Sequence, residues 1–231
     1  MKRHGGMVES NILLQLKEQD RSLYSEVFEA NTYNVKPQEL AGFTVIDIGA
    51  NKGFFSILAS LDGAKKIYAL EPNLDNYKVL LSNCRDFNNI IPVNLAVSQP
   101  GLKQVCISNE GALSRIITEG DLVNCISLEE FMKILPQEID LILKIDCEGS
   151  EYDILLPCPE LIKRFKYIYS EVHNNMHPNK SYNHVMLEEF INNLGFKSEI
   201  INSVWGWIAT DGTFTPFTTV DFSKSIKFTR I

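Results

Sequence analysis

The sequence lacks any apolar run that approaches the length of a membrane span. A transmembrane helix needs about 20 consecutive apolar residues, and every apolar run here is shorter. The N-terminus begins MKRHGG and then turns polar, so the hydrophobic region of a signal peptide is missing. We therefore expect a cytoplasmic protein without a membrane partner.

Basic residues are also scarce. The chain has 22 Lys and Arg against 29 Asp and Glu, which gives a formal net charge of −7. Surfaces that bind the phosphates of nucleic acids are usually rich in Lys and Arg. The composition therefore predicts no nucleic-acid partner, although it leaves room for a small basic pocket.

The cysteines form no framework. There are five, an odd number, and no two have the CxxC spacing of redox or zinc motifs. Scattered cysteines are typical of reduced thiols that fill small apolar gaps in cytosolic proteins. Only Cys147 stands out, because acidic residues surround it. The sequence also has no P-loop and no recognisable Ser–His–Asp arrangement.

What the sequence does contain is an alternation of strand-like and helix-like segments. From Phe43 onward, short apolar runs with the character of buried parallel strands alternate with helical patterns. This order indicates β-α-β units with a mostly parallel sheet, which is an α/β fold. The predicted strands are residues 43–48, 66–70, 93–97, 140–145 and 167–172.

The predicted helices lie between these strands and before them. One or two amphipathic helices are expected from Val8 to Ala30, and a short helix from Phe54 to Ser60. Asn73 is expected to cap a helix whose buried face consists of Leu74, Tyr77, Leu81 and Cys84. A last helix from about Asn183 to Leu194 should bury Met186, Leu187, Phe190, Ile191 and Leu194.

Two further regions have strand character. Residues 104–107 and 123–126 predict an extra hairpin or a lid-like insertion. Pieces around Ile200, 205–209 and 217–220 predict an antiparallel edge added to the sheet. No linker indicates a domain boundary, so we expect one domain over residues 1–231, with a helical extension at 1–40 and a catalytic core at 41–231.

The most informative segment is VIDIGANKG, which spans residues 45–53. Asp47 ends the first strand, and Gly49 and Gly53 follow it in the pattern DxGxxxG. In open α/β sheets, ligands bind at the carboxyl ends of the strands. Dinucleotide-binding proteins use GxGxxG to hold a pyrophosphate, which an acidic residue would repel. The pattern instead favours a cationic, amino-acid-like ligand such as S-adenosylmethionine, and we expect Ala50 and Asn51 to share its site.

Glu71 occupies the equivalent position after the second strand. It lies 18 residues beyond Gly53, and Pro72 keeps it extended. A carboxylate there is suited to accept hydrogen bonds from both hydroxyls of a ribose. The alternative is that Asp47 caps a loop and Glu71 is a solvated strand end, but both acids stand at the right strand ends with the glycines between them.

A second group of polar residues follows the fourth and fifth strands. Asp146 and Glu148 come after the fourth strand, and Glu171 and His173 alternate at the end of the fifth. Adjacent strands would bring these four residues together, and burying carboxylates without partners is costly. The group could hold a divalent metal, or one member could be the general base that takes a hydroxyl proton.

Other features are weaker. Asn94 and Ala96 end the third strand, where side-chain or backbone groups could contact an adenine, although Asn94 reads equally well as a polar loop residue. Glu148 and Glu151 could simply be first-turn helix residues stabilised by the helix dipole. His4, His177 and His184 have no metal-ligand spacing. A divalent metal at the group of Asp146, Glu148, Glu171 and His173 is possible but is not predicted.

Several of these segments together resemble one known family. VIDIGANKGFF, ALEPNLDNY, NLAVS, CISLEEF, KIDCEGSEYDIL and YIYSEVH occur in the order found in the FkbM family of S-adenosylmethionine-dependent methyltransferases. The match covers about Phe43 to Gly195, and the KIDxEGxE block is its specific part. Cys147 stands where the family often has a small apolar residue.

The resemblance implies a fold, a reaction and a set of site residues. It implies a Rossmann-like class I methyltransferase fold with a seven-stranded sheet, and O-methylation of a hydroxyl on a small molecule or sugar. It implies cofactor contacts for Asp47, Gly49, Gly53 and Glu71, with Asp146 and Glu148 between cofactor and acceptor. A cofactor-binding module without activity, or less favourably a nicotinamide-dependent oxidoreductase, remains an alternative, and the acceptor and the oligomeric state stay open.

Overall fold

The computed structural model describes most of the chain. It covers residues 5–108, 115–136, 140–174, 176–201, 206–208, 214–216 and 223–231, with the backbone alone described for 5–10, 206–208 and 214–216. Among these residues, no helix combines the length and the apolar character that a membrane crossing requires.

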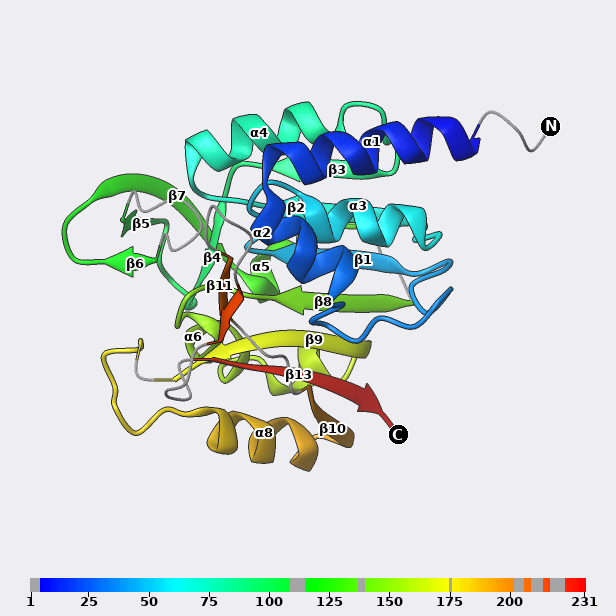
Figure 1. Cartoon of the computed structure of the whole chain (residues 1–231). Helices are drawn as coiled ribbons and strands as arrows, with labels where there is room; N and C mark the ends of the chain where they lie inside the picture. Colours follow the sequence, from blue (N-terminus) through cyan, green and yellow to red (C-terminus); the bar gives the residue numbers. More distant parts are fainter. Residues whose placement is uncertain are drawn as a thin grey trace.

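A seven-stranded sheet forms the centre of the molecule (Figure 1). Its strand order is β10-β13-β9-β8-β1-β2-β3. β13 runs antiparallel to both of its neighbours, whereas β9, β8, β1, β2 and β3 are mutually parallel. The predicted fold class, a mostly parallel sheet with an antiparallel strand from the C-terminal part, is therefore confirmed. The strands are β1 Thr44–Ile48, β2 Lys66–Leu70, β3 Ile90–Val93, β8 Leu141–Ile145, β9 Phe165–His173, β10 Phe196–Ile201 and β13 Ser223–Arg230.

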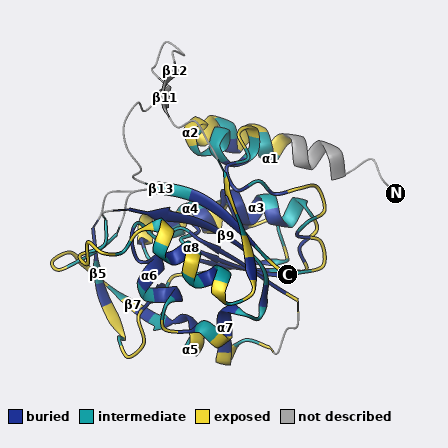
Figure 2. Ribbon diagram, turned by 90° about the horizontal axis from the view of Figure 1, so that it is seen from below, coloured by how far each residue is buried: buried dark blue, intermediate teal, exposed yellow. Residues whose placement is uncertain are grey.

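Helices cover both faces of this sheet, and each face has its own apolar core. One core joins the sheet to α1 (Gly5–Gln19), α3 (Phe54–Leu61) and α4 (Leu74–Cys84). The other joins it to α5 (Leu128–Ile134), α6 (Glu151–Leu155), α7 (Pro159–Ile162) and α8 (His184–Asn193). Figure 2 shows the sheet as the buried layer, with exposed residues on the outer sides of the helices.

The N-terminal helices pack onto the same core as α3. The segment contains α1, a short α2 (Arg21–Tyr24) and a π-helix, η1 (Ser25–Glu29), which agrees with the one or two helices predicted for residues 8–30. Leu16 and Val27 are buried in this core. Asp20 caps α2 and also forms an ion pair of 2.7 Å with Lys52 in the glycine loop. The N-terminal segment is thus tied directly to the loop that follows β1.

A second, smaller sheet follows β3. It has the order β4-β7-β5-β6, from β4 (Ala96–Ser98), β5 (Gln104–Ile107), β6 (Ile116–Ile117) and β7 (Asp121–Ser127). β5 and β7 pair antiparallel, which confirms the hairpin predicted from the sequence. Ser127 and Glu130 form a capping box at the start of α5, so β7 passes directly into the helix that packs on the main sheet.

Two details of the prediction were wrong in this region. Residues 93–97 do not form one strand, because β3 ends at Val93 and Ala96 begins β4, which pairs with β7 in the second sheet. Pro92 lies inside β3 rather than before it. Proline is tolerated there because β3 is the edge strand of the main sheet, where a missing N–H is harmless.

The buried face of α4 agrees with the prediction at Cys84 and at Tyr77, which packs against the core, but not at Leu74 and Leu81. Leu74 and Leu81 are 56% and 44% exposed, whereas Asn76, Leu80 and Cys84 are buried. The cause is the glycine loop, because Leu80 and Cys84 are the side chains that pack against Gly53. In α8, by contrast, the predicted stripe is confirmed, with Leu187 and Ile191 fully buried and its other members packed against the core.

The C-terminal part is confirmed in some places and was missed in others. β10 and β11 (Gly206–Ile208) match the strand pieces predicted around Ile200 and 205–209. β12 (Phe214–Pro216) pairs with β11. The piece predicted at 217–220 lies outside the described residues. β13 was not predicted because its sequence, SKSIKFTR, is polar. Lys227 is nevertheless buried, and its Nζ forms an ion pair of 2.6 Å with Glu39.

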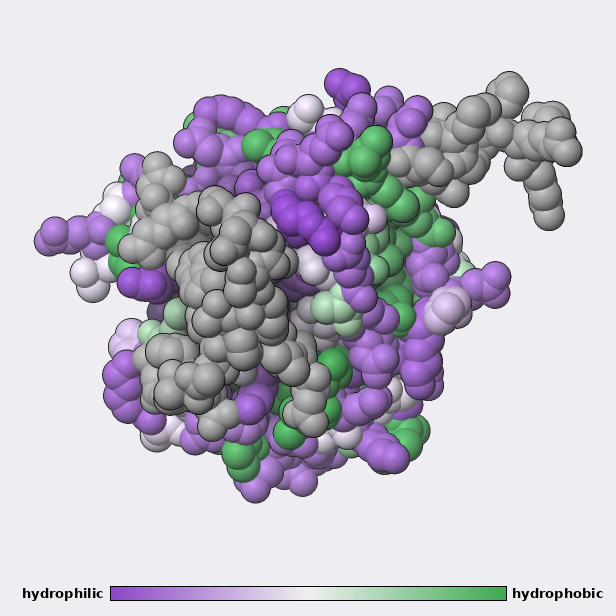
Figure 3. Space-filling view, viewed as in Figure 1, coloured by the Kyte–Doolittle hydropathy of each residue, from purple (hydrophilic) through white to green (hydrophobic). Residues whose placement is uncertain are grey.

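Where the residues are described, the surface that faces the viewer of Figure 1 is predominantly hydrophilic. Figure 3 shows apolar side chains in separate groups between charged and polar ones. This distribution agrees with the composition, which is 22% charged residues.

Candidate active site

A cleft lies at the carboxyl ends of the parallel strands. Its empty space is about 630 Å³, part of which is open solvent. Main-sheet residues form one side and the second sheet forms the other. The lining residues are Ile48, Gly49, Asn51, Leu70, Glu71, Pro72, Asn76, Leu95, Ala96, Val97, Ile107, Arg115, Ile116, Asp146, Cys147, Glu148 and Ser150.

The glycine loop is held closely against the neighbouring strands. The N–H groups of Gly49 and Ala50 donate to the carbonyl of Leu70, at 3.0 and 2.9 Å. Gly49 has a φ of 75°, and a Cβ there would lie only 1.9 Å from the carbonyl oxygen of Asp146. Only glycine therefore fits at this position. Gly49 and Asn51 line the cleft, whereas Ala50 and Gly53 pack behind it.

Glu71 lines the cleft at the end of β2 and is held by the backbone. Its two carboxylate oxygens accept hydrogen bonds from the N–H groups of Asn51 and Asn73, both at 2.8 Å. Burial raises the pKa of Glu71 to about 7, although these two hydrogen bonds act in the opposite direction. The carboxylate therefore has a fixed orientation and keeps lone pairs for further donors.

Asp47 lies beneath the cleft and does not line it. It is completely buried, its Oδ2 accepts a hydrogen bond of 2.7 Å from Ser56, and its Oδ1 is 3.3 Å from Lys144 Nζ. Lys144 also donates to the carbonyl of Gly49 at 2.7 Å and lies 3.7 Å from Asp146 Oδ2. Burial opposes the charge of Lys144, but Asp47 and Asp146 raise its pKa above the ordinary value. Asp47 thus contacts a lysine that connects the glycine loop to Asp146.

Asn94 also lies away from the cleft wall. Its Nδ2 donates to the carbonyls of Glu71 and Pro72, at 2.8 and 3.0 Å. Its amide therefore braces the turn after β2, while Leu95 and Ala96 line the cleft.

The acids that follow β8 and the polar residues that end β9 are brought together, as expected from adjacent parallel strands. His173 Nε2 lies 3.4 Å from Glu148 Oε2 and 3.8 Å from Glu171 Oε1. Asp146 and Glu148 line the cleft, and His173 and Glu171 lie next to them at the end of β9. Ser223 at the start of β13 donates to Glu171 at 2.6 Å.

Burial and mutual repulsion change how these groups titrate. Burial raises the pKa of Glu148 and of Glu171 to about 7, while His173 lowers both. Burial opposes the charge of His173, but Glu151, Glu148 and Glu171 raise its pKa well above the ordinary value. The balance favours a cationic imidazole placed among carboxylates that change protonation near neutral pH.

Sequence reasoning missed Glu151 as a residue of this site. It begins α6, as expected of a first-turn acid, but its side chain is completely buried. Oε1 accepts hydrogen bonds from the N–H of Cys147 at 2.9 Å and from His173 Nδ1 at 3.0 Å, and Oε2 accepts one of 3.1 Å from the N–H of Gly149. The spacing of Glu148 and Glu151 gave no signal that they contact opposite nitrogens of one imidazole.

Tyr33 is the other residue that the sequence did not reveal. It comes from the segment between η1 and β1, is buried, and donates a hydrogen bond of 3.0 Å to Asp146 Oδ2. Its ring packs against Phe55. A single tyrosine 113 positions away from Asp146 carries no local pattern that could have pointed to this contact.

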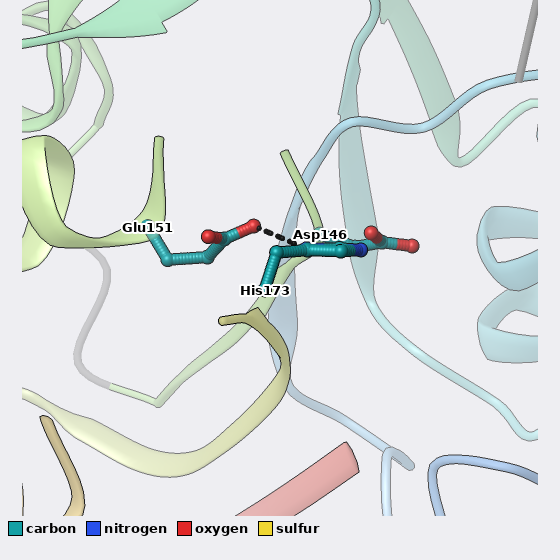
Figure 4. A group of neighbouring side chains, drawn as sticks. All are labelled: Asp146, Glu151 and His173. Atoms are coloured by element: carbon teal, nitrogen blue, oxygen red, sulfur yellow. Dashed lines mark hydrogen bonds and ion pairs between the residues drawn. The ribbon is translucent and has the colours of Figure 1, made fainter. Parts of the chain in front are cut away.

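Among the described residues, Asp146, Glu151 and His173 offer ligand atoms within 4.8 Å of one another. Figure 4 shows the imidazole between the two carboxylates. Glu151 and His173 already bind each other through Oε1 and Nδ1, and both Glu151 oxygens accept backbone N–H groups. A metal held by Glu151 would therefore compete with these hydrogen bonds.

The strand order, the antiparallel β13 and a cleft at the carboxyl ends of β1, β2 and β8 define a Rossmann-like class I methyltransferase. The match to the methyltransferase FkbM domain covers residues 47–198. The chain belongs to the FkbM methyltransferase family.

The chain is similar to several solved structures. A methyltransferase FkbM from Methylobacillus flagellatus KT is 13% identical, with a TM-score of 0.51 over 97% of this chain and 60% of that one. A precorrin-6Y C5,15-methyltransferase from Geobacter metallireducens GS-15 is 15% identical, with a TM-score of 0.49 over 87% and 84%. TrmK from M. capricolum, in complex with S-adenosyl-homocysteine, is 13% identical, with a TM-score of 0.47 over 88% and 68%. No curated protein is significantly similar in sequence.

Proposed function

We propose that the protein transfers a methyl group from S-adenosylmethionine to a hydroxyl oxygen of a small molecule or sugar. The observation that carries the proposal is the pair formed by the glycine loop and Glu71. They lie side by side on the cleft wall, and the N–H of Asn51 in the loop donates to the Glu71 carboxylate. An acid without a phosphate-binding loop beside it suits a ribose better than a pyrophosphate.

The residues present fit this cofactor. The Glu71 carboxylate accepts two backbone N–H groups and a hydrogen bond from the Asn76 side chain, and its remaining lone pairs suit a ribose hydroxyl. Apolar residues on the second-sheet side of the cleft suit a face of an adenine, and these are Leu95, Val97, Ile107 and Ile116. The close approach of Gly49 to the Asp146 carbonyl places the loop next to the acids at the end of β8. In this arrangement, Asp146 balances the positive charges at the amino-acid end of S-adenosylmethionine.

The bound cofactor would supply a methyl group already activated by its sulfonium, so the chain mainly has to position the acceptor and receive its proton. Glu148 lines the cleft beside Asp146 and is the carboxylate best placed to accept that proton. Burial raises its pKa to about 7, which is where a general base works best at neutral pH. Glu171 and His173 lie beyond it and would orient the acceptor or Glu148.

The acceptor is proposed to be a small molecule rather than a nucleic acid. The net charge is −7, and the residues around Glu148 on β8, β9 and α6 are mainly acidic. A polyanion would be repelled from such a surface.

Calorimetric titration of the purified protein with S-adenosylhomocysteine, with NADH as the control, tests the cofactor. Micromolar binding of S-adenosylhomocysteine alone is the expected result, and binding of NADH instead would refute the proposal. Methyl transfer from radiolabelled cofactor to a panel of neutral hydroxyl compounds and to RNA then tests the acceptor. Transfer to RNA but to none of the small compounds would show that the proposed acceptor class is wrong.

A further inference from the structure

The His173 ring is held from both sides by carboxylates that differ in their surroundings. On one side, Nδ1 lies 3.0 Å from Glu151, which is completely buried. On the other side, Nε2 faces Glu148 at 3.4 Å, and Glu148 lines the cleft. The imidazole therefore stands between an acid that solvent does not reach and an acid that an acceptor can touch.

The orientation of Glu151 is fixed by the backbone. The N–H groups of Cys147 and Gly149, in the turn between β8 and α6, both donate to its carboxylate. Gly149 has a φ of 101°, and a Cβ there would lie 2.8 Å from Met176, so the turn requires glycine at this position. Hydrogen bonds from backbone N–H groups stabilise the ionised form of a buried carboxylate.

The backbone of His173 is fixed as well. Tyr152, the next residue of α6, donates its hydroxyl to the carbonyl of His173 at 3.3 Å. α6 thus holds His173 by its carbonyl and by its ring, so rotation of the ring would cost both the Glu151 hydrogen bond and the contact with Glu148.

We propose that Glu151 is a positioning residue, which binds Nδ1–H of His173 and thereby keeps Nε2–H directed at Glu148. Glu148, not Glu151, touches the acceptor. Because a carboxylate faces each ring nitrogen, the ring is stabilised with protons on both, and the buried carboxylate on Nδ1 leaves Nε2–H as the group that faces the cleft. The effect on the reaction rests on the proposed function, but the state of the ring does not.

The charged groups around the ring come from three elements. Glu151 belongs to α6, Lys144 lies on β8 and Asp146 and Glu148 follow it, and Glu171 lies on β9. Burial raises the pKa of Glu26 in η1 well above its ordinary value, so that group is neutral. Glu151, Glu148 and Glu171 favour the protonated ring, whereas the cation Lys144 acts on the acids and lowers the pKa of Glu171. Glu151 is distinguished from the rest by its hydrogen bond to Nδ1.

The wild-type protein gives the first test. Nitrogen-15 NMR of the imidazoles, with each of the four histidines assigned by His→Gln substitution, reports which ring nitrogens carry protons. Both nitrogens of His173 are expected to be protonated at pH 7. A His173 that titrates at its ordinary value, or that lacks a proton on Nδ1, would overturn the proposal whether or not any variant folds.

The variant Glu151→Gln gives the second test, because it removes the charge and keeps the shape. Its His173 pKa is expected to fall by about one unit or more. Its kcat is expected to fall about tenfold or more, with the KM for S-adenosylmethionine nearly unchanged. Glu151→Asp, which keeps the carboxylate, is expected to recover part of the lost rate. An unchanged His173 pKa in a folded Glu151→Gln protein would contradict the assignment.

Asp153→Asn is the matched control. Asp153 lies on the same helix and contacts another histidine, His177, at 3.3 Å, outside the cleft. It should leave the His173 pKa and kcat unchanged. If wild-type protein fails to bind S-adenosylhomocysteine, the proposed function is refuted, whereas the NMR result still decides the role of Glu151.

Discussion

The side of the cleft formed by β1 and β2 differs from the side formed by β8 and β9 in how its polar groups are held. On the first side, two backbone N–H groups hold Glu71, and the residues that donate them lie at most 20 positions from Glu71 in the sequence. On the second side, side chains hold one another across long separations, such as the 113 positions between Tyr33 and Asp146. A short motif can encode the first side, whereas the second exists only once the whole sheet has formed.

The largest effect is expected from breaking the backbone-built side at Gly49. In Gly49→Ala, the new Cβ would collide with the Asp146 carbonyl, and the φ of 75° is unfavourable for alanine. We expect the free energy of unfolding to fall by about 3 kcal/mol. Binding of S-adenosylhomocysteine should become undetectable. Thermal unfolding and calorimetry measure the two effects.

Gly42→Ala is the control for Gly49→Ala. Gly42 has a φ of 80°, but a Cβ there would meet nothing within 4 Å. The Gly42→Ala variant isolates the cost of placing alanine at a positive φ, about 1–2 kcal/mol. It should leave cofactor binding intact. Equal losses in the two variants would show that the contact with β8 does not matter.

The next largest effect is expected on the side-chain-built side. Glu148→Gln removes the proposed proton acceptor, so kcat should fall about 10²- to 10⁴-fold. Affinity for S-adenosylhomocysteine should stay within a few-fold of wild type. In the wild type, a base whose pKa is about 7 must lose its proton to work, so kcat should rise with pH through that value and level off above it. A Glu148→Gln enzyme that keeps this rise would assign the base to another group.

Glu71→Ala sharpens the comparison from the cofactor side. Removing the carboxylate should weaken binding of S-adenosylhomocysteine about 10- to 100-fold, which corresponds to the loss of hydrogen bonds to a charged acceptor. Titration with adenine, which has no ribose, provides the control, because its affinity should change little. Cofactor affinity within twofold of wild type would refute the role of Glu71 at the ribose.

The same contrast explains what the sequence could predict. Most of the strands, the glycine loop and the position of Glu71 at a strand end follow local rules of periodicity, backbone freedom and strand ends, and these were placed correctly, apart from the strand predicted at 93–97. Asp47 was identified as important, but its contact is a buried lysine on the neighbouring strand, which only the sheet register reveals. β13 was missed because two of its polar residues, Lys227 and Ser225, are buried, and Lys227 pairs with Glu39. An alternation of apolar and polar residues does not reveal a strand of this kind. Tyr33 acts across the fold, beyond the reach of any motif, and Glu151 ends the KIDxEGxE block, which does not show its contact with His173.

The smallest of these effects is expected for Tyr33→Phe, which removes one hydroxyl at the junction of the N-terminal segment and the active site. Asp146 loses one hydrogen bond but keeps Lys144 nearby, so we expect kcat to fall about tenfold with little change in stability. Tyr169→Phe is a closely matched control, because Tyr169 also packs against Phe55 and donates to a carboxylate, that of Glu39, at 2.9 Å away from the cleft. Similar losses of kcat in both variants would mean that Tyr33 supports the core and not Asp146. A loss in Tyr33→Phe alone would show that residues ahead of the matched methyltransferase domain complete its active site.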